Sequence, residues 1–577
     1  MNVRHVLCTL GFGLCLLTGI AAAQRPPPLP PALPPPPPPS PNQPRDGLAT
    51  QKTGTAKLVG RVTSLDTGRP LRRAVVRAAG PDLRDGKSVS TDADGRWELR
   101  EIPAGRLTIS VTKGGYVPLS YGQRRPFEAG KTVDVANGAT VDKLDVALPR
   151  GGAVTGRVVD EFGEPVTGVN VSALRFRYLG GQRQLAPSGT SDTTDDLGNY
   201  RLHGLPPGDY YVAARPNTFT FLGNSEDRNG YGQSFYPGAS NVNEAQRLQV
   251  AVGQEAQNMM ISLVPSKISN ISGTITSVTG KPVKQGMVMM RENGPVAMTS
   301  IRPAMIENGA WKISGVAPGE YVLVAQVMDV EAIGAAGTTA GMPTPEIATV
   351  PLTVTGEDVT GVALTTTLGG TARGVIRFES GAAPTTPSST TTLVAVDQDS
   401  NAMARTSSAT VKPDWTFELK GLSGKRMVRA INLPSGWTLK SVIVDGTDVI
   451  DSGLEVKPGQ EESNVQVVLT NRKTEISGTV QDTKGAAETD FVVLVFSSDP
   501  QHWGWQSRHV RLARPDQTGR FLIDGLPAGA YLAVALEYVE PGEETNPEFL
   551  ERVKTLATPV RLTEGEKKPI TLKLAAQ

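Results

Sequence analysis

Residues 195–210 read Asp195-Asp-Leu-Gly198-Asn-Tyr200-Arg-Leu202-His-Gly-Leu-Pro206-Pro-Gly208-Asp-Tyr210. An Asp followed three positions later by Gly predicts a turn, because the carboxylate caps backbone amides and Gly accepts a positive φ. The alternation that follows the turn predicts a strand with the aromatic and aliphatic side chains facing inward. Pro-Pro-Gly then predicts a second turn, which leads into another alternating strand. We expect strands joined by such tight turns to pair antiparallel.

The same turn–strand–turn segment recurs along the chain. Residues 92–107 and 516–531 repeat the spacing of Gly, aromatic, aliphatic and Pro-x-Gly positions, and residues 309–321 repeat it with Pro318-Gly319 at the second turn. A further copy is degenerate: Phe417 and Leu419 keep the register, but Trp415 stands where the other copies have Gly, and Ser423-Gly424 replaces the Pro-Gly turn. Repetition at this period indicates a tandem array of similar units.

Each unit also begins alike, with a Gly-x-aliphatic strand start at Gly60, Gly156, Gly273, Gly374 and Gly478. With the later alternating runs, a unit contains about seven short strands in roughly 100 residues, as in an immunoglobulin-like sandwich. The sequence therefore predicts an all-β protein of about five tandem immunoglobulin-like, prealbumin-like β-sandwich modules. The predicted boundaries are 1–23 for a signal peptide, 24–54 for a proline-rich disordered linker, and 55–149, 150–265, 266–370, 371–472 (degenerate) and 473–577 for modules 1 to 5.

The first residues resemble a secretory signal. Arg4 and His5 precede an apolar run over 6–20, and Ala21-Ala-Ala23 provides small residues for cleavage. The run is shorter than the roughly 20 apolar residues of a membrane span, so a retained anchor is the less favoured alternative. Both cysteines, Cys8 and Cys15, lie inside this segment. We expect an exported mature protein without thiols, located in the periplasm, outside the cell or on its surface.

Charge and composition narrow the choice of partners. Lys plus Arg (58) almost equals Asp plus Glu (57) and no charged block stands out, which argues against nucleic-acid binding. No second stretch is apolar enough to span a membrane, so no integral span is expected after signal cleavage. The proline run after residue 24 predicts a stiff polyproline II spacer. The expected partner is a glycan or an envelope protein, and the expected state is an extended monomer.

The repeated segments resemble the carboxypeptidase regulatory-like domain family, most closely in units one, two and five. The run from Tyr116 through Tyr121-Gly-Gln-Arg-Arg to Arg150-Gly-Gly is similar to multi-module bacterial members. The resemblance implies a seven-stranded prealbumin-like sandwich that recurs in tandem on exported bacterial proteins, in a carbohydrate-binding-like class of folds. The peptidase activity that gives the family its name belongs to a different domain, which this chain does not contain.

The sequence offers few groups for catalysis, and we expect no enzyme, no catalytic residue, no metal site and no cofactor. Neither His203 nor His502 stands in a metallopeptidase His-x-x-Glu pattern. His502 and His509 would point to opposite faces of a strand, so joint ligation of a metal needs a loop between them. Calcium binding at turns such as 92–95 and 192–196 is an alternative to simple capped turns, which explain the same residues.

Aromatic residues in polar, Gly-rich segments are the candidates for ligand binding: Trp503, Trp505, Tyr231, Phe235 and Tyr236. Aromatic faces at loop tips can stack on sugar rings, but scarce aromatics are also needed in the module cores. Residues 546–553 depart from the β pattern, because an Asn cap followed by Pro and apolar spacing predicts a short helix.

These observations favour a non-catalytic scaffold of the cell envelope that acts in binding or structure, including binding of carbohydrate. The alternative is an accessory protein or enzyme of polysaccharide or peptide processing, with its site in modules 4 and 5.

Overall fold

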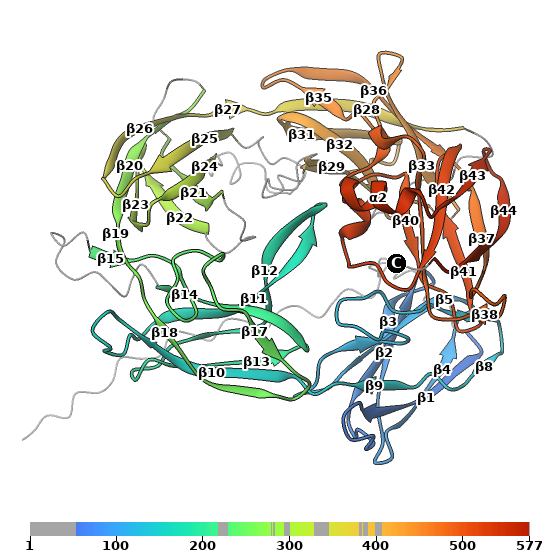
Figure 1. Cartoon of the computed structure of the whole chain (residues 1–577). Coiled ribbons are helices and arrows are strands. Elements are labelled where there is room, and N and C mark those ends of the chain that lie inside the picture. The colour runs from blue at the N-terminus through green and yellow to red at the C-terminus, as the bar shows by residue number, and fades with distance from the viewer. Residues whose placement is uncertain are drawn as a thin grey trace, which may run out of the picture. The chain divides into compact units, whose positions relative to one another are not determined.

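The computed structural model describes residues 54–575, except 217–228, 279, 281–282, 294–300, 328–345, 380–383, 385–390, 398–406 and 435. The predicted signal peptide and all but the last residue of the predicted linker lie outside the described residues. The described residues belong to one compact unit, which is almost entirely β-structure (Figure 1). The predicted module boundaries stay predictions, and the modules are defined below by their strands.

Modules 1 and 2 each consist of two main sheets. In module 1 the orders are β4-β1-β8, with β9 also on β1, and β3-β2-β5-β6, with β7 also on β5. In module 2 they are β13-β10-β18 and β12-β11-β14-β16, with β17 also on β14, and a small β15-β19 pair crosses the predicted boundary at 265. Their bounds are β1 (Ala56–Ser64), β2 (Val75–Gly80), β3 (Leu83–Ser90), β4 (Arg96–Ile102), β5 (Gly105–Thr112), β6 (Leu119–Ser120), β7 (Val133–Val135), β8 (Thr140–Val141), β9 (Val146–Leu148), β10 (Gly152–Val159), β11 (Val169–Leu179), β12 (Gln182–Thr193), β13 (Asn199–Leu205), β14 (Gly208–Pro216), β15 (Asn229–Tyr231), β16 (Ser234–Phe235), β17 (Leu248–Val250), β18 (Glu255–Ser262) and β19 (Pro265–Lys267).

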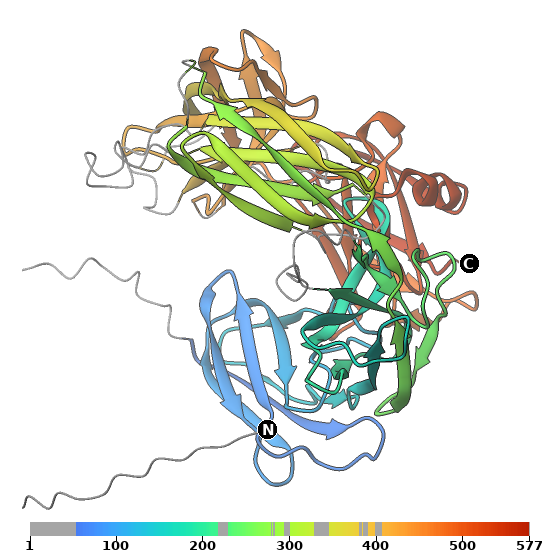
Figure 2. The same ribbon diagram turned by 90° about the vertical axis from the view of Figure 1, so that its left-hand side faces the viewer.

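Module 3 differs, because its strands form one continuous sheet in the order β26-β20-β23-β22-β21-β24-β25-β27. Figure 2 shows these green and yellow strands running side by side. Their bounds are β20 (Ser269–Thr276), β21 (Gln285–Glu292), β22 (Ile301–Glu307), β23 (Ala310–Val316), β24 (Gly319–Val327), β25 (Glu346–Val354), β26 (Val359–Thr365) and β27 (Thr367–Leu368).

Modules 4 and 5 return to two sheets each. The orders are β31-β28-β36-β33-β34 and β30-β29-β32-β35 in module 4, and β38-β37-β41, with β44 also on β37, and β40-β39-β42-β43 in module 5. Their bounds are β28 (Gly370–Phe378), β29 (Thr392–Asp397), β30 (Ser407–Thr410), β31 (Thr416–Leu422), β32 (Gly424–Ile431), β33 (Thr438–Val444), β34 (Thr447–Asp448), β35 (Leu454–Val456), β36 (Glu461–Thr470), β37 (Glu475–Gln481), β38 (Ala487–Glu488), β39 (Val492–Ser497), η2 (Pro500–His502), β40 (Val510–Ala513), β41 (Arg520–Asp524), β42 (Gly529–Leu536), η3 (Glu543–Thr545), α2 (Pro547–Lys554), β43 (Thr558–Leu562) and β44 (Lys567–Lys573).

The recurring segment forms the centre of each core, as the sequence predicts. The aromatic residue after each turn is at most 3% exposed, namely Trp97, Tyr200, Trp311, Phe417 and Phe521. Each lies opposite the Gly that begins its module, as in the pairs Gly60–Trp97 and Gly478–Phe521. A Cβ on any of these five glycines would overlap a backbone carbonyl of the module's closing strand. Gly is therefore required there because the closing strand passes directly beside the first strand.

The turn before the aromatic residue is capped as predicted. In module 1 the Asp92 carboxylate accepts hydrogen bonds from the backbone N–H groups of Asp94 and Arg96, and Gly95 has φ +73°. In module 4 Trp415 occupies the Gly position with φ +65°, a conformation that is uncommon for a side chain of this size. The Trp415 ring packs edge-on against Phe378 at 4.7 Å between centroids, which compensates for the unfavourable backbone.

One expectation about strand pairing is wrong. The strands on either side of the Pro-x-Gly turn do not pair with each other: β4 pairs with β1, whereas β5 pairs with β2 in the opposite sheet. The turn therefore carries the chain across the sandwich. Where a Tyr follows it, the hydroxyl donates back to a carbonyl four residues earlier, as in Tyr210 to Pro206 and Tyr531 to Pro527.

The predicted short helix is confirmed as α2. The Asn546 side chain accepts the N–H of Phe549, Pro547 starts the helix, and Phe549, Leu550 and Val553 are buried against the outer face of the β39–β42 sheet. Among the described residues, no helix has the length and apolar character needed to cross a membrane.

Candidate functional site

The structure places most of the predicted ligand-binding aromatics in packed positions. Phe235 is 4% exposed and lies in an apolar cluster with Leu174 and Leu185. Tyr236 packs against the core of module 2. Trp503 packs edge-on against Phe496, and its indole N–H donates to the carbonyl of Ser497 at 2.7 Å. These three side chains therefore present little free aromatic surface to a sugar.

The two other candidates differ from each other. Tyr231 packs partly against the module 2 core, and its hydroxyl donates to the Glu161 carboxylate. Burial raises the pKa of Tyr231, and the adjacent Glu161 adds to this effect. Trp505 is 43% exposed. Of the five candidates, Trp505 thus has the largest solvent-facing ring.

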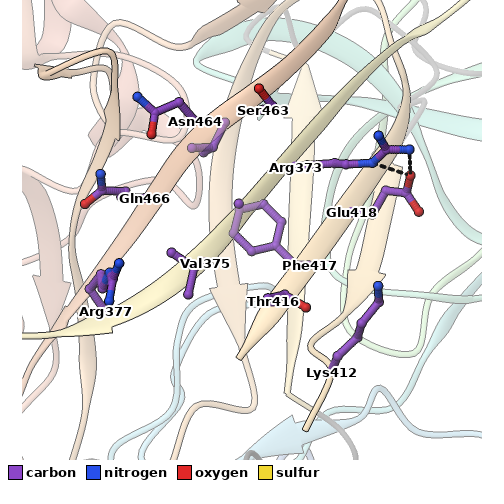
Figure 3. A pocket seen from close by; sticks show the side chains of 12 residues that line it. Arg373, Val375, Arg377, Lys412, Thr416, Phe417, Glu418, Ser463, Asn464 and Gln466 are labelled. Carbon is purple, nitrogen blue, oxygen red and sulfur yellow. Dashed lines mark hydrogen bonds and ion pairs between the residues drawn. The ribbon is translucent and has the colours of Figure 1, made fainter. Parts of the chain in front are cut away.

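One pocket lies on a sheet of module 4 and has a volume of about 550 Å³. Figure 3 shows the Arg373 guanidinium directed at the Glu418 carboxylate, with Lys412 below this pair and with Arg377 and Gln466 on the other side of the pocket. Arg373 also pairs with Glu461, and the hydrogen bond from Arg373 lowers the pKa of Glu418. Phe417 belongs to the lining but is 2% exposed, so it offers no stacking face. The pocket is polar, and the positive charge of Arg373 is paired with the carboxylates of Glu418 and Glu461.

A second group of polar side chains lies where modules 4 and 5 meet. We call Asp451, His502, Arg508, His509 and Tyr531 the junction cluster. Arg508 binds Asp451 in a fork, with Nε 2.8 Å from Oδ1 and Nη2 2.7 Å from Oδ2. His509 Nε2 lies 3.1 Å from the same Oδ2. The cluster therefore joins one carboxylate of module 4 to two side chains of module 5.

The histidines of the junction cluster are brought together by the loop between β39 and β40. Asp499 caps the short helix η2, and Pro500 occupies its first position, so the chain folds back directly after the strand. The His502 and His509 rings consequently stack with centroids 4.2 Å apart and 15° between their planes. These residues do not share one strand, so the loop that joint ligation would need lies between them. Asp499-Pro500 is the sequence signal that could have revealed this.

The electrostatics of the junction cluster follow from its contacts. Burial alone would raise the pKa of Asp451, but the hydrogen bonds from His509 and Arg508 outweigh it, and the pKa lies below its ordinary value. Burial raises the pKa of the Tyr531 hydroxyl. Asp451 therefore remains a carboxylate well into the acid range, and Tyr531 stays protonated.

A third polar group connects module 5 to module 1. Arg514 pairs with Glu128 of module 1 and, at 2.7 Å, with Asp490 of module 5. Its side chain is 3% exposed and that of Glu128 is 7% exposed. Beside them, Gln517 exchanges two hydrogen bonds with the backbone of Asp134, at 2.8 and 2.9 Å. The sequence predicts an extended monomer, whereas these contacts join module 5 to module 1. A buried charged group is costly without a partner, so the pairing of Arg514 with Glu128 favours this contact.

A family model agrees with this fold. The family model of the carboxypeptidase regulatory-like domain matches residues 57–149 and 153–221, which lie in modules 1 and 2. The chain is a tandem β-sandwich protein whose first two modules are similar to this domain, as the sequence predicts. The matched family is a non-catalytic structural domain.

Individual relatives are more distant. Colossin-A of Dictyostelium discoideum is 24% identical over 287 residues, which are 45% of this chain and 2% of that protein. The chain therefore spans only a small part of this relative.

Solved structures with similar segments include pilins and a collagen-binding protein of bacteria. The minor pilin GBS52 of Streptococcus agalactiae is 11% identical, with 36% of this chain and 95% of that chain covered and a TM-score of 0.22. Two B repeat units of the collagen-binding protein of Staphylococcus aureus are 13% identical, with 72% and 99% covered and a TM-score of 0.12. BcpA, the major pilin subunit of Bacillus cereus, is 13% identical, with 54% and 99% covered and a TM-score of 0.14.

Proposed function

We propose that the protein is an exported, non-catalytic scaffold of the cell envelope, whose modules hold binding surfaces in fixed positions for a glycan or an envelope protein. The observation that supports this proposal is that polar side chains with low exposure join one module to another. Arg508 and Arg514 both bind carboxylates of another module, with 57 and 386 residues between the partners. Charged side chains that could otherwise take part in catalysis are thus used to join modules.

The surface that we propose for a glycan is centred on Trp505. Its exposed ring belongs to the polar loop 498–508, and stacking on a sugar needs both an apolar face and nearby hydrogen-bond donors. Arg511 lies in the adjoining strand β40, but its guanidinium donates to the carbonyls of Ser507 and Val510, so it stabilises the loop instead of reaching outward.

Two measurements test the proposal. Fractionation of cells that produce the natural chain should recover the protein outside the cytoplasm, and recovery only in the cytoplasm would contradict export. A glycan array followed by isothermal titration should identify an envelope polysaccharide that binds. Trp505→Ala should weaken this binding by at least about tenfold, given the 1–3 kcal/mol typical of hydrophobic contact. The matched control is Phe162→Ala, which removes an aromatic ring that is 82% exposed in module 2.

The alternative is an enzyme of polysaccharide or peptide processing with its site in modules 4 and 5. The contact between Asp451 and His509 favours it, because a carboxylate that orients an imidazole is a common catalytic pair. Release of sugar or peptide by the purified protein, abolished in Asp451→Asn, would establish this alternative and overturn the non-catalytic proposal.

A further inference from the structure

Three side chains of the junction cluster carry the types of atom that bind transition metals. Asp451, His502 and His509 each offer one ligand atom, and these atoms lie within 4.8 Å of one another. They are the one such group found among the described residues. We propose that they bind a single Zn²⁺ or similar first-row divalent ion, which ties module 4 to module 5.

The hydrogen bonds of His509 provide the first argument. Tyr531 has one hydroxyl proton, which it donates to the carbonyl of Pro527 at 2.8 Å. The hydroxyl oxygen therefore accepts from Nδ1–H of His509, at 3.1 Å. In the neutral imidazole this leaves Nε2 without a proton, so that its lone pair faces Oδ2 of Asp451 at 3.1 Å. Two acceptors at this distance repel each other unless a positive centre lies between them, either a proton or a metal ion.

The spacing of the same two atoms fits a metal. Zn²⁺ binds His nitrogen and carboxylate oxygen at about 2.0–2.2 Å with tetrahedral angles, so two ligand atoms lie roughly 3.3 Å apart. The separation of Nε2 and Oδ2 is close to this edge length. His502, stacked on His509, needs a rotation of its ring to complete the set, and its side chain is only half-buried. Three protein ligands leave a fourth position for water.

The surroundings also resemble the outer shell that metal sites require. A ligating His normally donates its other ring N–H to a fixed acceptor, which here is Tyr531. A ligating carboxylate is normally hydrogen-bonded as well, and Arg508 holds both oxygens of Asp451, with Nε on Oδ1 and Nη2 on Oδ2. The second lone pair of Oδ2 is the one that would bind the ion. Arg508 is in turn fixed by the carbonyl of Lys440 at 2.7 Å. The positive charge of Arg508 lowers the affinity for any cation, so a metal with strong His affinity is required.

The ligand types select the class of ion. Two imidazoles and one carboxylate suit Zn²⁺, Co²⁺, Ni²⁺ or Cu²⁺, whereas Ca²⁺ and Mg²⁺ prefer sets made only of oxygen atoms. The site therefore differs in kind from the Asp-rich turns considered for calcium, in which the Asp92 carboxylate is already used by backbone N–H groups.

The test is a titration of the untagged, chelator-treated full chain with ZnCl₂ by isothermal titration calorimetry, and with Co²⁺ followed by its absorption spectrum. We expect one ion per chain. His502→Ala and Asp451→Asn should each weaken binding by at least about tenfold, since even outer-shell changes have effects of this size. The matched control is His203→Ala, which removes an exposed histidine of module 2 and should leave binding unchanged.

A second readout separates a metal from a bridging proton. Zn²⁺ should slow amide hydrogen exchange in residues 440–451 and 498–509 of the natural chain but not of His502→Ala. Because His502 is only half-buried, this variant should fold, which circular dichroism of the chelated protein checks. Absence of Zn²⁺ uptake, or uptake that His502→Ala and Asp451→Asn do not change, would overturn the proposal and leave the proton as the bridging charge.

Discussion

Arg508 and Arg514 lie just outside the two ends of β40, yet they join module 5 to its neighbours in different ways. Arg514 is 3% exposed and meets two carboxylates, those of Glu128 and Asp490. Arg508 is 20% exposed and meets one carboxylate, Asp451, which it shares with His509. The first junction is buried at Arg514 and Glu128. The second is partly open to solvent and places two histidines beside one carboxylate, so we expect it to respond to pH and to metal ions.

The largest expected effect is at the buried junction. Arg514→Met should destabilise the contact between modules 1 and 5 by about 3–5 kcal/mol, because Glu128 is left as an uncompensated buried charge. Amide hydrogen exchange of residues 121–131 measures the opening free energy of this contact. In the double variant with Glu128→Gln most of this loss should be recovered, since the amide oxygen still accepts the N–H groups of Arg124 and Arg125. Equal exchange in natural and variant proteins would show that Arg514 does not hold the junction.

Asp451→Asn should have a smaller effect at the open junction, about 1–2 kcal/mol, because its side chain is 28% exposed and solvent screens the pair. Exchange of residues 440–451 measures it. Residues 121–131 serve as the internal control and should keep their protection.

The open junction should also depend on pH. The pKa of Asp451 in the folded protein lies below its ordinary value, mainly because of His509 and Arg508. The stability that it contributes is therefore fully present above the ordinary carboxylate pKa of about 4 and is lost as the pH falls below it. Exchange of residues 440–451, corrected for intrinsic rates, should show this loss in the natural chain. The acid-dependent part should be absent from Asp451→Asn.

Tyr531→Phe should destabilise module 5 by about 1–1.5 kcal/mol, because the hydroxyl bonds both Pro527 and His509. Tyr210→Phe is the matched variant in module 2, where the hydroxyl donates to the Pro206 carbonyl. We expect Tyr531→Phe, but not Tyr210→Phe, to change Zn²⁺ binding. Urea unfolding of both variants, with the natural chain beside them, measures the difference, and equal Zn²⁺ affinities would separate Tyr531 from the metal site.

Trp505→Ala should change stability by no more than about 0.5 kcal/mol, since its ring is 43% exposed. Urea unfolding checks this value. A much larger loss would mean that the ring is needed for packing in the loop 498–508, and would weaken its assignment to ligand binding.

The sequence predicts the modules well and the junctions poorly. The inward-facing aromatic residues, the capped turns and the helix at Pro547 all follow from residues close together in the chain, where turn chemistry and side-chain alternation act. The loop that stacks His502 on His509 also has a local signal in Asp499-Pro500. Arg514 and Glu128 are 386 residues apart, and nothing near either residue indicates its partner. Contacts between modules depend on how the surfaces of the folded modules fit together. Local sequence patterns do not encode this fit.

One feature of every module bears on mechanical force. The first strand lies parallel to a closing strand, as β1 does to β9, β10 to β18, β20 to β26, β28 to β36 and β37 to β44. Tension on the two ends of a module pulls such a pair in opposite directions along its length. All the hydrogen bonds between the two strands are then loaded together in shear, instead of opening one after another as in a peeled hairpin. A chain of such modules resists stretching at each link in the same way, a property suited to a protein that is held under tension.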